Sequence, residues 1–452
     1  MSQPTEPPRL DKRAEAKAVL LRALFAFVPL LVVAGVATLV LTLLERRGFV
    51  ATERIDDSVL HQPVDPLRRE QTDQGELFHF GGYNMQAATF PVRKGPGVYR
   101  AAVVGESFVL GLPYYVPRGR SLNYGDISHW LEAEAQARFP SRRFEVINAG
   151  AGGRNSAGVL ELVLTMLKVD PDVVIVATGN NEGIIAATAF NEVMHRWVVY
   201  RLLKKTFLPE PALNERPYLM VQNEDKDIIR RSFDEHIRSM VRAAKEQRVP
   251  IVLCTMPINL RYTNPFLVPR DDALRKGREL FAAGRFEEAI KALSESKQQA
   301  WAAKFIGDCL LSQGEFAHAK TMYRISVELN PLNRMRPSLN ETLRQISREE
   351  DVPLVDLEQA VEAQSANGIP DPSLYCDYCH MTWRGYELVA RTMLNALIER
   401  KLIQGNRDEP LPQPAALALI YQRHWDELLN TRWERSACSL QADSLTAAFT
   451  GH

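Results

Sequence analysis

The sequence predicts an α/β domain of three layers, in which a five-stranded parallel sheet lies between two layers of helices. Two observations carry this prediction. Short, continuously apolar runs alternate with longer runs of helical periodicity between Tyr99 and Leu397, a pattern typical of parallel sheets buried on both faces. Polar or glycine-rich turns directly follow three of the apolar runs, and parallel sheets bind ligands beyond the carboxyl ends of their strands.

Each expected strand is a short run rich in valine, isoleucine and leucine, which favour buried strands. The strands are expected at Tyr99–Val104, Phe144–Ile147, Asp172–Ala177, Pro250–Thr255 and Val352–Leu357. The helices between them are expected at Trp130–Arg138, Gly158–Lys168 and Ile228–Gln247. The connection between the fourth and fifth strands is too long for a simple crossover, so it is expected to hold an insertion.

Composition limits the classes of function. The chain has 452 residues, 55 Lys and Arg, 55 Asp and Glu, and therefore no net charge. Proteins that bind nucleic acid usually have an excess of basic residues. This chain has no such excess, so no nucleic-acid partner is expected. Five cysteines in this length exclude a scaffold built on disulfides. The length itself suggests two or three domains.

Residues 23–44 contain no charged side chain and would span ~33 Å as a helix, enough for a bilayer core of ~30 Å. The sequence therefore predicts a cytoplasmic head at 1–22, one transmembrane helix at 23–44, and a stalk and domain entry at 45–97. A cleaved signal peptide is the alternative, but charged residues from Glu45 onward follow the span. Five Lys or Arg precede the span, and three, Arg46, Arg47 and Arg54, stand just after it, which predicts an inner-membrane protein with its main domain on the periplasmic side.

A stretch near residue 300 is self-similar. Leu280–Ala289 and Leu310–Ala319 share a leucine, a glycine, a phenylalanine and an alanine at a spacing of 30 residues. The second copy continues to Tyr323 and Pro331, and together they resemble tetratricopeptide repeats. We therefore expect a helical insertion at 271–331 that offers a surface to a protein partner, with an ordinary helical hairpin as the alternative. The main domain then covers 98–270 and 332–404, followed by a tail at 405–452.

Four short blocks carry the residues capable of chemistry. They are Gly105–Phe108, Asn148–Ser156, Gly179–Glu182 and Asp377–His380. The first three directly follow expected strands, so they should meet at one edge of the sheet. A serine hydroxyl becomes a nucleophile when a base takes its proton, histidine has the pKa for that role, and a carboxylate can orient the imidazole.

The four blocks, in this order, resemble those of the SGNH (GDSL-type) hydrolase family over about residues 99–397. The resemblance implies a flavodoxin-like sheet, Ser107 as nucleophile, His380 as base and Asp377 as its partner. It assigns the oxyanion hole to the backbone N–H of Ser107, the backbone N–H of Gly153 and the side-chain amide of Asn181. No cofactor or metal is implied.

The sequence departs from the family pattern at three places. Glu106 replaces the usual Asp beside the nucleophile. The second block also offers Gly150 and Gly152 as donors, and the third also offers Asn180. Asn181 is preferred because it directly precedes the acid of the third block. Because of these alternatives, the sequence assigns the hydrogen-bond donors of the oxyanion hole less definitely than it assigns the nucleophile.

Other residues admit competing interpretations. Cys376-x-x-Cys379-His380 also matches the attachment motif of haem c, in which His380 would bind iron. A Cys376–Cys379 disulfide is a further alternative outside the cytoplasm, and zinc lacks a fourth ligand. Arg154 is expected on the solvated surface, with contact to an anionic substrate as the alternative. Cys254 and Cys309 are expected to be buried.

The predicted function is a membrane-anchored serine esterase that forms an acyl-enzyme on Ser107, acting on acyl groups of envelope glycans or lipids. Transfer of the acyl group to a sugar hydroxyl at the same site is one alternative. A non-catalytic scaffold that binds a partner through the repeats is another. The stretch His195–Phe207 combines aromatic and basic residues, and it is interpreted as a membrane-surface helix, a lid or an ordinary packed helix.

Overall fold

A computed structural model describes residues 33, 35–44, 66–73, 75–82, 84–112, 114, 125–182, 197–207, 226–263, 268–330, 334–370 and 372–403. The chain divides into two units. One comprises residues 1–61 and 187–210, and the other comprises residues 62–186 and 211–452. The second unit holds all the blocks singled out by the sequence.

The expected five-stranded parallel sheet is confirmed. Its strands are β4 (Val98–Gly105), β5 (Arg143–Gly150), β6 (Val173–Ala177), β7 (Ile251–Cys254) and β8 (Leu354–Val355), in the spatial order β5-β4-β6-β7-β8. All four neighbouring pairs are parallel. In the central strand Gly105 is in register with Gly150 on one side and Ala177 on the other. The carboxyl ends of these three strands therefore lie level, and the first three blocks emerge side by side.

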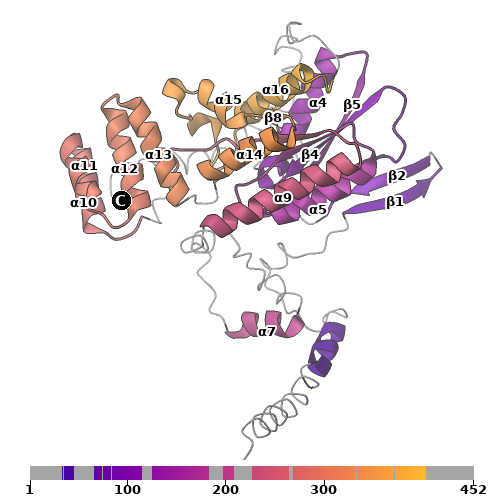
Figure 1. Cartoon of the computed structure of the whole chain (residues 1–452), viewed down its shortest axis with the longest axis horizontal. Coiled ribbons are helices and arrows are strands. Elements are labelled where there is room, and N and C mark those ends of the chain that lie inside the picture. Colours follow the sequence, from indigo (N-terminus) through magenta and orange to yellow (C-terminus); the bar gives the residue numbers. More distant parts are fainter. Residues whose placement is uncertain are drawn as a thin grey trace, which may run out of the picture. The chain divides into compact units, whose positions relative to one another are not determined.

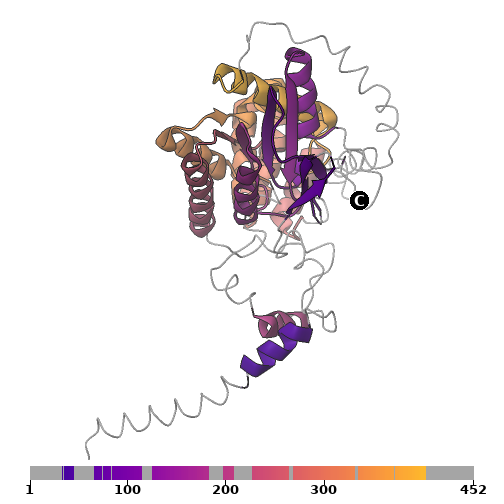
Figure 2. The ribbon, with the colours of Figure 1, turned by 90° about the vertical axis from the view of Figure 1, so that its right-hand side faces the viewer.

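Helices cover both faces of this sheet (Figures 1 and 2). On one face α5 (Ser156–Met166), α9 (Lys226–Glu246) and α14 (Pro337–Glu350) pack together and contact the strands. On the other, α4 (Ile127–Arg138) packs on β5, and α16 (Trp383–Glu399) packs on α4, α15 (Leu357–Ala363) and β8. The three central strands β4, β6 and β7 are almost wholly buried, as their continuous apolar runs predicted.

Within the expected stalk and domain entry at 45–97, residues 45–65 lie outside the described residues, and the described part from residue 66 on contains a second sheet. Its strands β1 (Leu67–Thr72), β2 (Gly75–Phe80) and β3 (Ala88–Pro91) are antiparallel in the order β1-β2-β3. Phe78, Phe80 and Phe90 are buried in the same core as the parallel sheet. This sheet could not be predicted from the sequence pattern. Strand β1 has the sequence LRREQT and is largely exposed, so it lacks the alternation of apolar and polar residues by which a strand is recognised.

The insertion between β7 and β8 consists of two helical hairpins. The first pairs α10 (Asp272–Ala282) with α11 (Phe286–Ser294), and the second pairs α12 (Gln299–Ser312) with α13 (Phe316–Leu329). The turns place Gly284 at φ +73° and Gly314 at φ +82°, where glycine avoids the strain of a side chain. The self-similar stretches therefore occupy equivalent turns. Figure 1 shows the four helices together, beside α14 and α15.

The first unit is described at residues 33 and 35–44 and at 197–207. Residues 35–44 are helical, and α7 (Val198–Phe207) falls within the basic stretch identified in the sequence. Within the described residues, we find no helix with the length and apolar character needed to cross a membrane. Half of the predicted span, residues 23–32 and 34, lies outside the described residues, as do the head at 1–22 and the tail at 405–452.

Candidate active site

A four-residue helix presents Ser107. β4 ends at Gly105, Glu106 is the N-cap, and α3 (Ser107–Leu110) begins with the serine. The turn fits because two glycines leave room for it: a Cβ on Gly105 would lie 2.1 Å from the Ala177 carbonyl oxygen, and one on Gly150 would lie 2.1 Å from the Leu110 nitrogen. Close packing of α3 on the strand ends thus holds Ser107 at the edge of the sheet.

The loop before α16 brings the fourth block to this serine. His380 Nε2 lies 2.8 Å from Ser107 Oγ, and His380 Nδ1 lies 2.6 Å from Asp377 Oδ2. The other carboxylate oxygen of Asp377, Oδ1, accepts the backbone N–H of Cys379 at 2.9 Å and of His380 at 2.8 Å. The hydroxyl, the imidazole and the carboxylate, which are separated by up to 273 positions in the chain, thus form one hydrogen-bonded chain.

Electrostatics keep Asp377 ionised. Burial opposes its charge, but the His380 imidazole and the two backbone N–H groups outweigh burial and hold the pKa of the Asp377 carboxyl below its ordinary value. A carboxylate at Nδ1 favours the tautomer in which Nδ1 carries the proton and Nε2 is free to accept one. The arrangement can therefore take the proton of Ser107.

The structure distinguishes among the candidate glycine donors. The Gly150 N–H donates to Asn148 Oδ1 at 2.9 Å, and the Gly152 N–H donates to the Asn84 carbonyl at 3.1 Å. The Gly153 N–H has no hydrogen-bond partner among the described residues, and Gly153 adopts φ +75°. Of the three glycines, Gly153 is thus the one whose N–H remains available for a substrate oxygen.

The two asparagines of the third block are also distinguishable. Asn180 Oδ1 accepts the Met335 N–H at 2.9 Å, which ties this side chain to the start of α14. Asn181 Nδ2 donates to the Arg154 carbonyl at 2.9 Å, which uses one of its two N–H bonds. The second N–H of Asn181 can serve an oxyanion, together with the N–H of Ser107, which has no partner among the described residues.

The GDSL-like lipase/acylhydrolase family model matches residues 103–388, more than half of the chain and all four blocks. The chain belongs to this family. It is a serine hydrolase that acts on ester bonds. A comparison with curated proteins finds no match.

Solved structures of GDSL-like hydrolases resemble the chain at low sequence identity. A lipolytic protein of the G-D-S-L family from Desulfitobacterium hafniense DCB-2 is 13% identical, covering 66% of this chain and 99% of its own, with a TM-score of 0.34. Axe2, an acetylxylan esterase from Geobacillus stearothermophilus, is 15% identical, with coverage of 66% and 94% and a TM-score of 0.34. A GDSL-like lipase from Bacteroides thetaiotaomicron VPI-5482 is 12% identical, with coverage of 67% and 88% and a TM-score of 0.32.

In this GDSL-like hydrolase Glu106 links the nucleophile turn to the third block. Its side chain is fully buried and accepts the N–H of Asn180 at 2.8 Å and of Asn181 at 3.3 Å. Burial raises the pKa of Glu106 to about 8. The longer side chain at this position thus supports the loop that carries the amide donor.

Glu182 forms a second buried carboxyl site beside the first. It accepts the N–H of Ser156 at 2.6 Å and the hydroxyl of Ser156 at 3.0 Å, and that hydroxyl also lies 2.9 Å from His236 Nδ1. Burial raises the pKa of Glu182 to about 7 despite the two hydrogen bonds from Ser156. Glu182 in turn raises the pKa of Glu106. The two carboxyls therefore oppose each other's ionisation.

We expect the stability of the protein to fall as the pH rises from 5.5 to 8.5. A Glu with a raised pKa holds its proton in the folded state after the unfolded state has lost it, so stability decreases between the unfolded value of 4.5 and the folded value. Glu182→Gln mimics the neutral acid and should remove about 2 kcal/mol of the decrease over this range. Chemical denaturation at several pH values gives the free energy of unfolding of the wild type and of the variant. If the two free energies decrease in parallel as the pH rises, the prediction is wrong.

The cysteine motif lies beside the catalytic residues. Cys376 and Cys379 are buried and are not joined by a disulfide in the structure, and the Nε2 atom of His380 lies 2.8 Å from Ser107 Oγ. A carboxylate oxygen of Asp377, the Cys379 sulfur and a His380 nitrogen lie within 4.8 Å of one another. Burial and the nearby Asp377 and Glu106 raise the pKa of the Cys379 thiol well above its ordinary value. A metal requires the thiolate, so this donor set fits one poorly.

Four further side chains can be compared with the sequence expectations. Arg154 is not on the solvated surface: its exposed fraction is 9%, and its side chain crosses Gly158 on α5. Cys254 and Cys309 are buried, as expected. Asn259, which sequence reasoning missed, is fully buried and donates to the Asp377 carbonyl at 2.8 Å. Its signal was its place just after the fourth strand, the edge at which the other blocks were found.

Proposed function

We propose that this GDSL-like hydrolase cleaves acyl esters through an acyl-enzyme on Ser107, with His380 as general base and Asp377 as its partner. The observation that carries the proposal is the continuous chain from Ser107 Oγ through His380 to Asp377, with distances of 2.8 and 2.6 Å. Few functions other than nucleophilic catalysis need a serine, an imidazole and a carboxylate in this order.

The proposed mechanism has two half-reactions. His380 Nε2 takes the Ser107 proton as Oγ attacks the ester carbonyl, and it then returns that proton to the leaving alcohol. Water, activated by His380, attacks the acyl-enzyme and releases the acid. In both steps the carbonyl oxygen gains negative charge, which the N–H groups of Ser107 and Gly153 and the Asn181 amide stabilise. Loss of one such donor typically costs ~3 kcal/mol.

A fluorophosphonate probe tests the proposal, because it reacts with activated serines. We expect the folded protein to be labelled once per chain and to hydrolyse a short ester such as p-nitrophenyl acetate. Mass spectrometry should locate the label on Ser107. Folded protein that is neither labelled nor active would instead support the scaffold alternative.

We also propose that residues 23–44 anchor the enzyme in the inner membrane, with its hydrolase domain on the periplasmic side. The uncharged length of this segment and the excess of Lys and Arg before it support this placement. Acyl groups of envelope glycans or lipids would then be within reach as substrates. Transfer of the acyl group to a sugar hydroxyl would use the same site.

Fractionation tests the anchor. We expect the full chain to stay in the membrane pellet after a high-salt wash and to be extracted by detergent. A chain lacking residues 1–44 should move to the supernatant, because it has lost the apolar segment. A chain lacking only residues 1–22 keeps that segment and is the matched control for shortening. Release of the full chain by salt alone would refute the anchor.

A further inference from the structure

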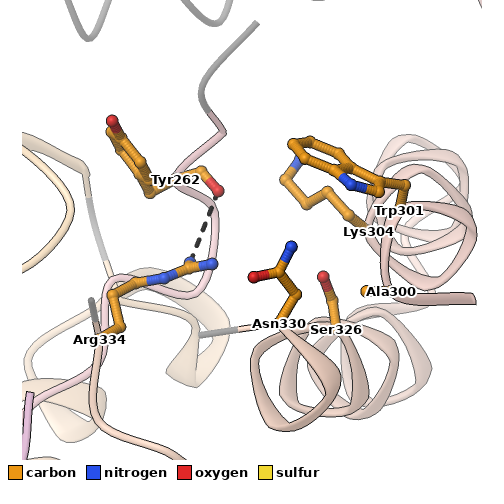
Figure 3. A pocket seen from close by; sticks show the side chains of 7 residues that line it. All are labelled: Tyr262, Ala300, Trp301, Lys304, Ser326, Asn330 and Arg334. Atoms are coloured by element: carbon orange, nitrogen blue, oxygen red, sulfur yellow. Dashed lines mark hydrogen bonds between the residues drawn. The ribbon is translucent and has the colours of Figure 1, made fainter. Parts of the chain in front are cut away.

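The helical insertion leaves and re-enters the hydrolase domain at two places that lie side by side. Asn259 and Tyr262 come just before the insertion in the chain, and Arg334 comes just after it. Arg334 Nη1 donates to the Asn259 carbonyl at 2.5 Å and to the Tyr262 carbonyl at 3.5 Å. Figure 3 shows the guanidinium bonded to the Tyr262 carbonyl, beside side chains of α12 and α13. One arginine therefore joins the two ends of the insertion.

The burial of Arg334 makes these contacts important for the local structure. Its exposed fraction is 3%, and a buried cation is unfavourable unless hydrogen bonds or other groups compensate for the lost water. The two carbonyl oxygens contribute to this compensation, as does the face of the Tyr262 ring, whose centroid lies 5.7 Å from the guanidinium carbon. The Tyr262 N–H also donates to the Asn259 carbonyl, at 3.4 Å. Arg334 is therefore fixed to a turn that spans residues 259–262.

This turn contacts the loop that carries the general base. Asn259 is fully buried, and its side-chain amide donates to the main-chain carbonyl of Asp377 at 2.8 Å. The Tyr262 ring packs edge-on against the Tyr378 ring with centroids 5.9 Å apart, and the Tyr378 ring lies 5.6 Å from the His380 imidazole. Two successive residues of the catalytic loop are thus in contact with the turn that Arg334 fixes.

The residue after Arg334 contacts the other side of the active site. The Met335 N–H donates to Asn180 Oδ1 at 2.9 Å, and Asn180 directly precedes Asn181, the amide donor of the oxyanion hole. A Cβ on Gly179 would lie 2.3 Å from Met335 Sδ, so the methionine packs directly on the backbone of the third block. The segment at which the insertion re-enters the domain therefore supports the loops of both the base and the oxyanion donor.

We propose that Arg334 is a positioning residue for the reaction at Ser107. Through Asn259 it fixes the main chain that carries Asp377 and His380, so that the imidazole stays within reach of the serine hydroxyl. A displaced base slows the chemical step, whereas the binding of a small ester does not depend on that base. The insertion is therefore part of the support of the active site. This inference rests on the proposed ester hydrolysis.

Arg334→Gln tests the effect on the reaction. Glutamine is too short to join both carbonyls of the turn, so the loop of the base should lose part of its support. We expect kcat on p-nitrophenyl acetate to fall about 30-fold, with KM within about twofold of the wild-type value. The kcat is calculated per active site, counted by fluorophosphonate titration, so a smaller folded fraction does not contribute. An unchanged kcat per active site would overturn the proposal.

Arg336→Gln is the matched control. The exposed fraction of Arg336 is also 3%, but its Nη1 donates to the Glu328 carbonyl of α13, at 2.9 Å, rather than to the turn at 259–262. The control therefore removes a buried arginine of the same segment without releasing the catalytic loop. It should keep the wild-type kcat, and an equal loss in this variant would refute the assignment to Arg334.

Asn259→Leu tests the route and replaces the first variant if thermal melts show that Arg334→Gln does not fold. It removes the amide that donates to Asp377 and should lower kcat by a similar factor. Because the two residues act through one chain of hydrogen bonds, the double variant should lose no more than about the larger of the two single losses. A double loss equal to the product of the single losses would show that Arg334 does not act through Asn259.

Hydrogen exchange without substrate separates this proposal from the proposed function. The amides of Cys379 and His380 donate to Asp377 Oδ1 in the wild type. In Arg334→Gln a peptide covering 375–381 should exchange about fivefold faster or more, while peptides of β4 and β6 keep their protection. Unchanged exchange of this loop would overturn the proposal. Faster exchange in the variant, together with a wild type that hydrolyses no ester, would support the role of Arg334 in holding the loop and refute only the proposed hydrolysis.

Discussion

Ser107→Ala is expected to lower kcat on a short acyl ester by four to six orders of magnitude. The Ser107 hydroxyl supplies the bond to the acyl group, and the only side-chain hydrogen bond it makes to a described residue is with His380 Nε2. No other hydroxyl lies in that position within the described part of the chain. Steady-state kinetics and fluorophosphonate labelling measure the loss, and both should disappear together.

The substitution should leave the fold intact, since it removes one oxygen whose side-chain hydrogen bond is made to His380. A melting temperature close to that of the wild type is the required check. Ser156→Ala is the matched control, because Ser156 also follows a strand, but its hydroxyl is committed to Glu182 and His236. That variant should still be labelled. Retained turnover in Ser107→Ala would refute the acyl-enzyme.

Asp377→Asn is expected to reduce kcat by about 10⁴-fold. Asp377 Oδ1 accepts two backbone N–H groups, so the carbonyl oxygen of an asparagine should occupy that position. Its NH₂ group would then face His380 Nδ1 and donate to it. The imidazole proton would be forced onto Nε2, where the ring can no longer accept the proton of Ser107.

The pH profile distinguishes this explanation from a structural defect. The deprotonated wild-type imidazole is ready to act as base, whereas the variant holds the wrong tautomer at every pH. Raising the pH should therefore not restore kcat to the wild-type value. Asp377→Glu is the companion variant, because it retains the carboxylate and should retain more activity than Asn. Wild-type turnover by Asp377→Asn would show that Asp377 does not orient the base.

The central sheet was predictable because its strands are buried on both faces and are therefore apolar throughout. The ends of three observed strands, β4, β6 and β7, differ by at most one residue from the ends of the apolar runs predicted to be strands. The residues of the site could be located for a related reason, since polar side chains directly after such strands must meet at one edge. The short β8 shows the limit: its apolar run extends over Val352–Leu357, but two residues pair in the sheet.

Other features depend on contacts that a linear pattern does not show. The choice of Gly153 over Gly150 and Gly152 depends on which N–H groups are already occupied, and that follows from Asn148 and Asn84. The burial of Arg154 depends on the path of its side chain over α5. The contact between the Tyr262 and Tyr378 rings depends on the start of a long insertion lying beside the catalytic loop.

The Glu106 carboxyl has a consequence for how the enzyme is assembled. It directly precedes the nucleophile and accepts the backbone N–H groups of Asn180 and Asn181. One carboxyl therefore joins the turn after β4 to the turn after β6. The attacking oxygen and the amide that receives the developing charge consequently keep their spacing without help from a bound molecule. Reorganisation before bond formation is then small, which is the condition under which fixed dipoles lower a barrier most.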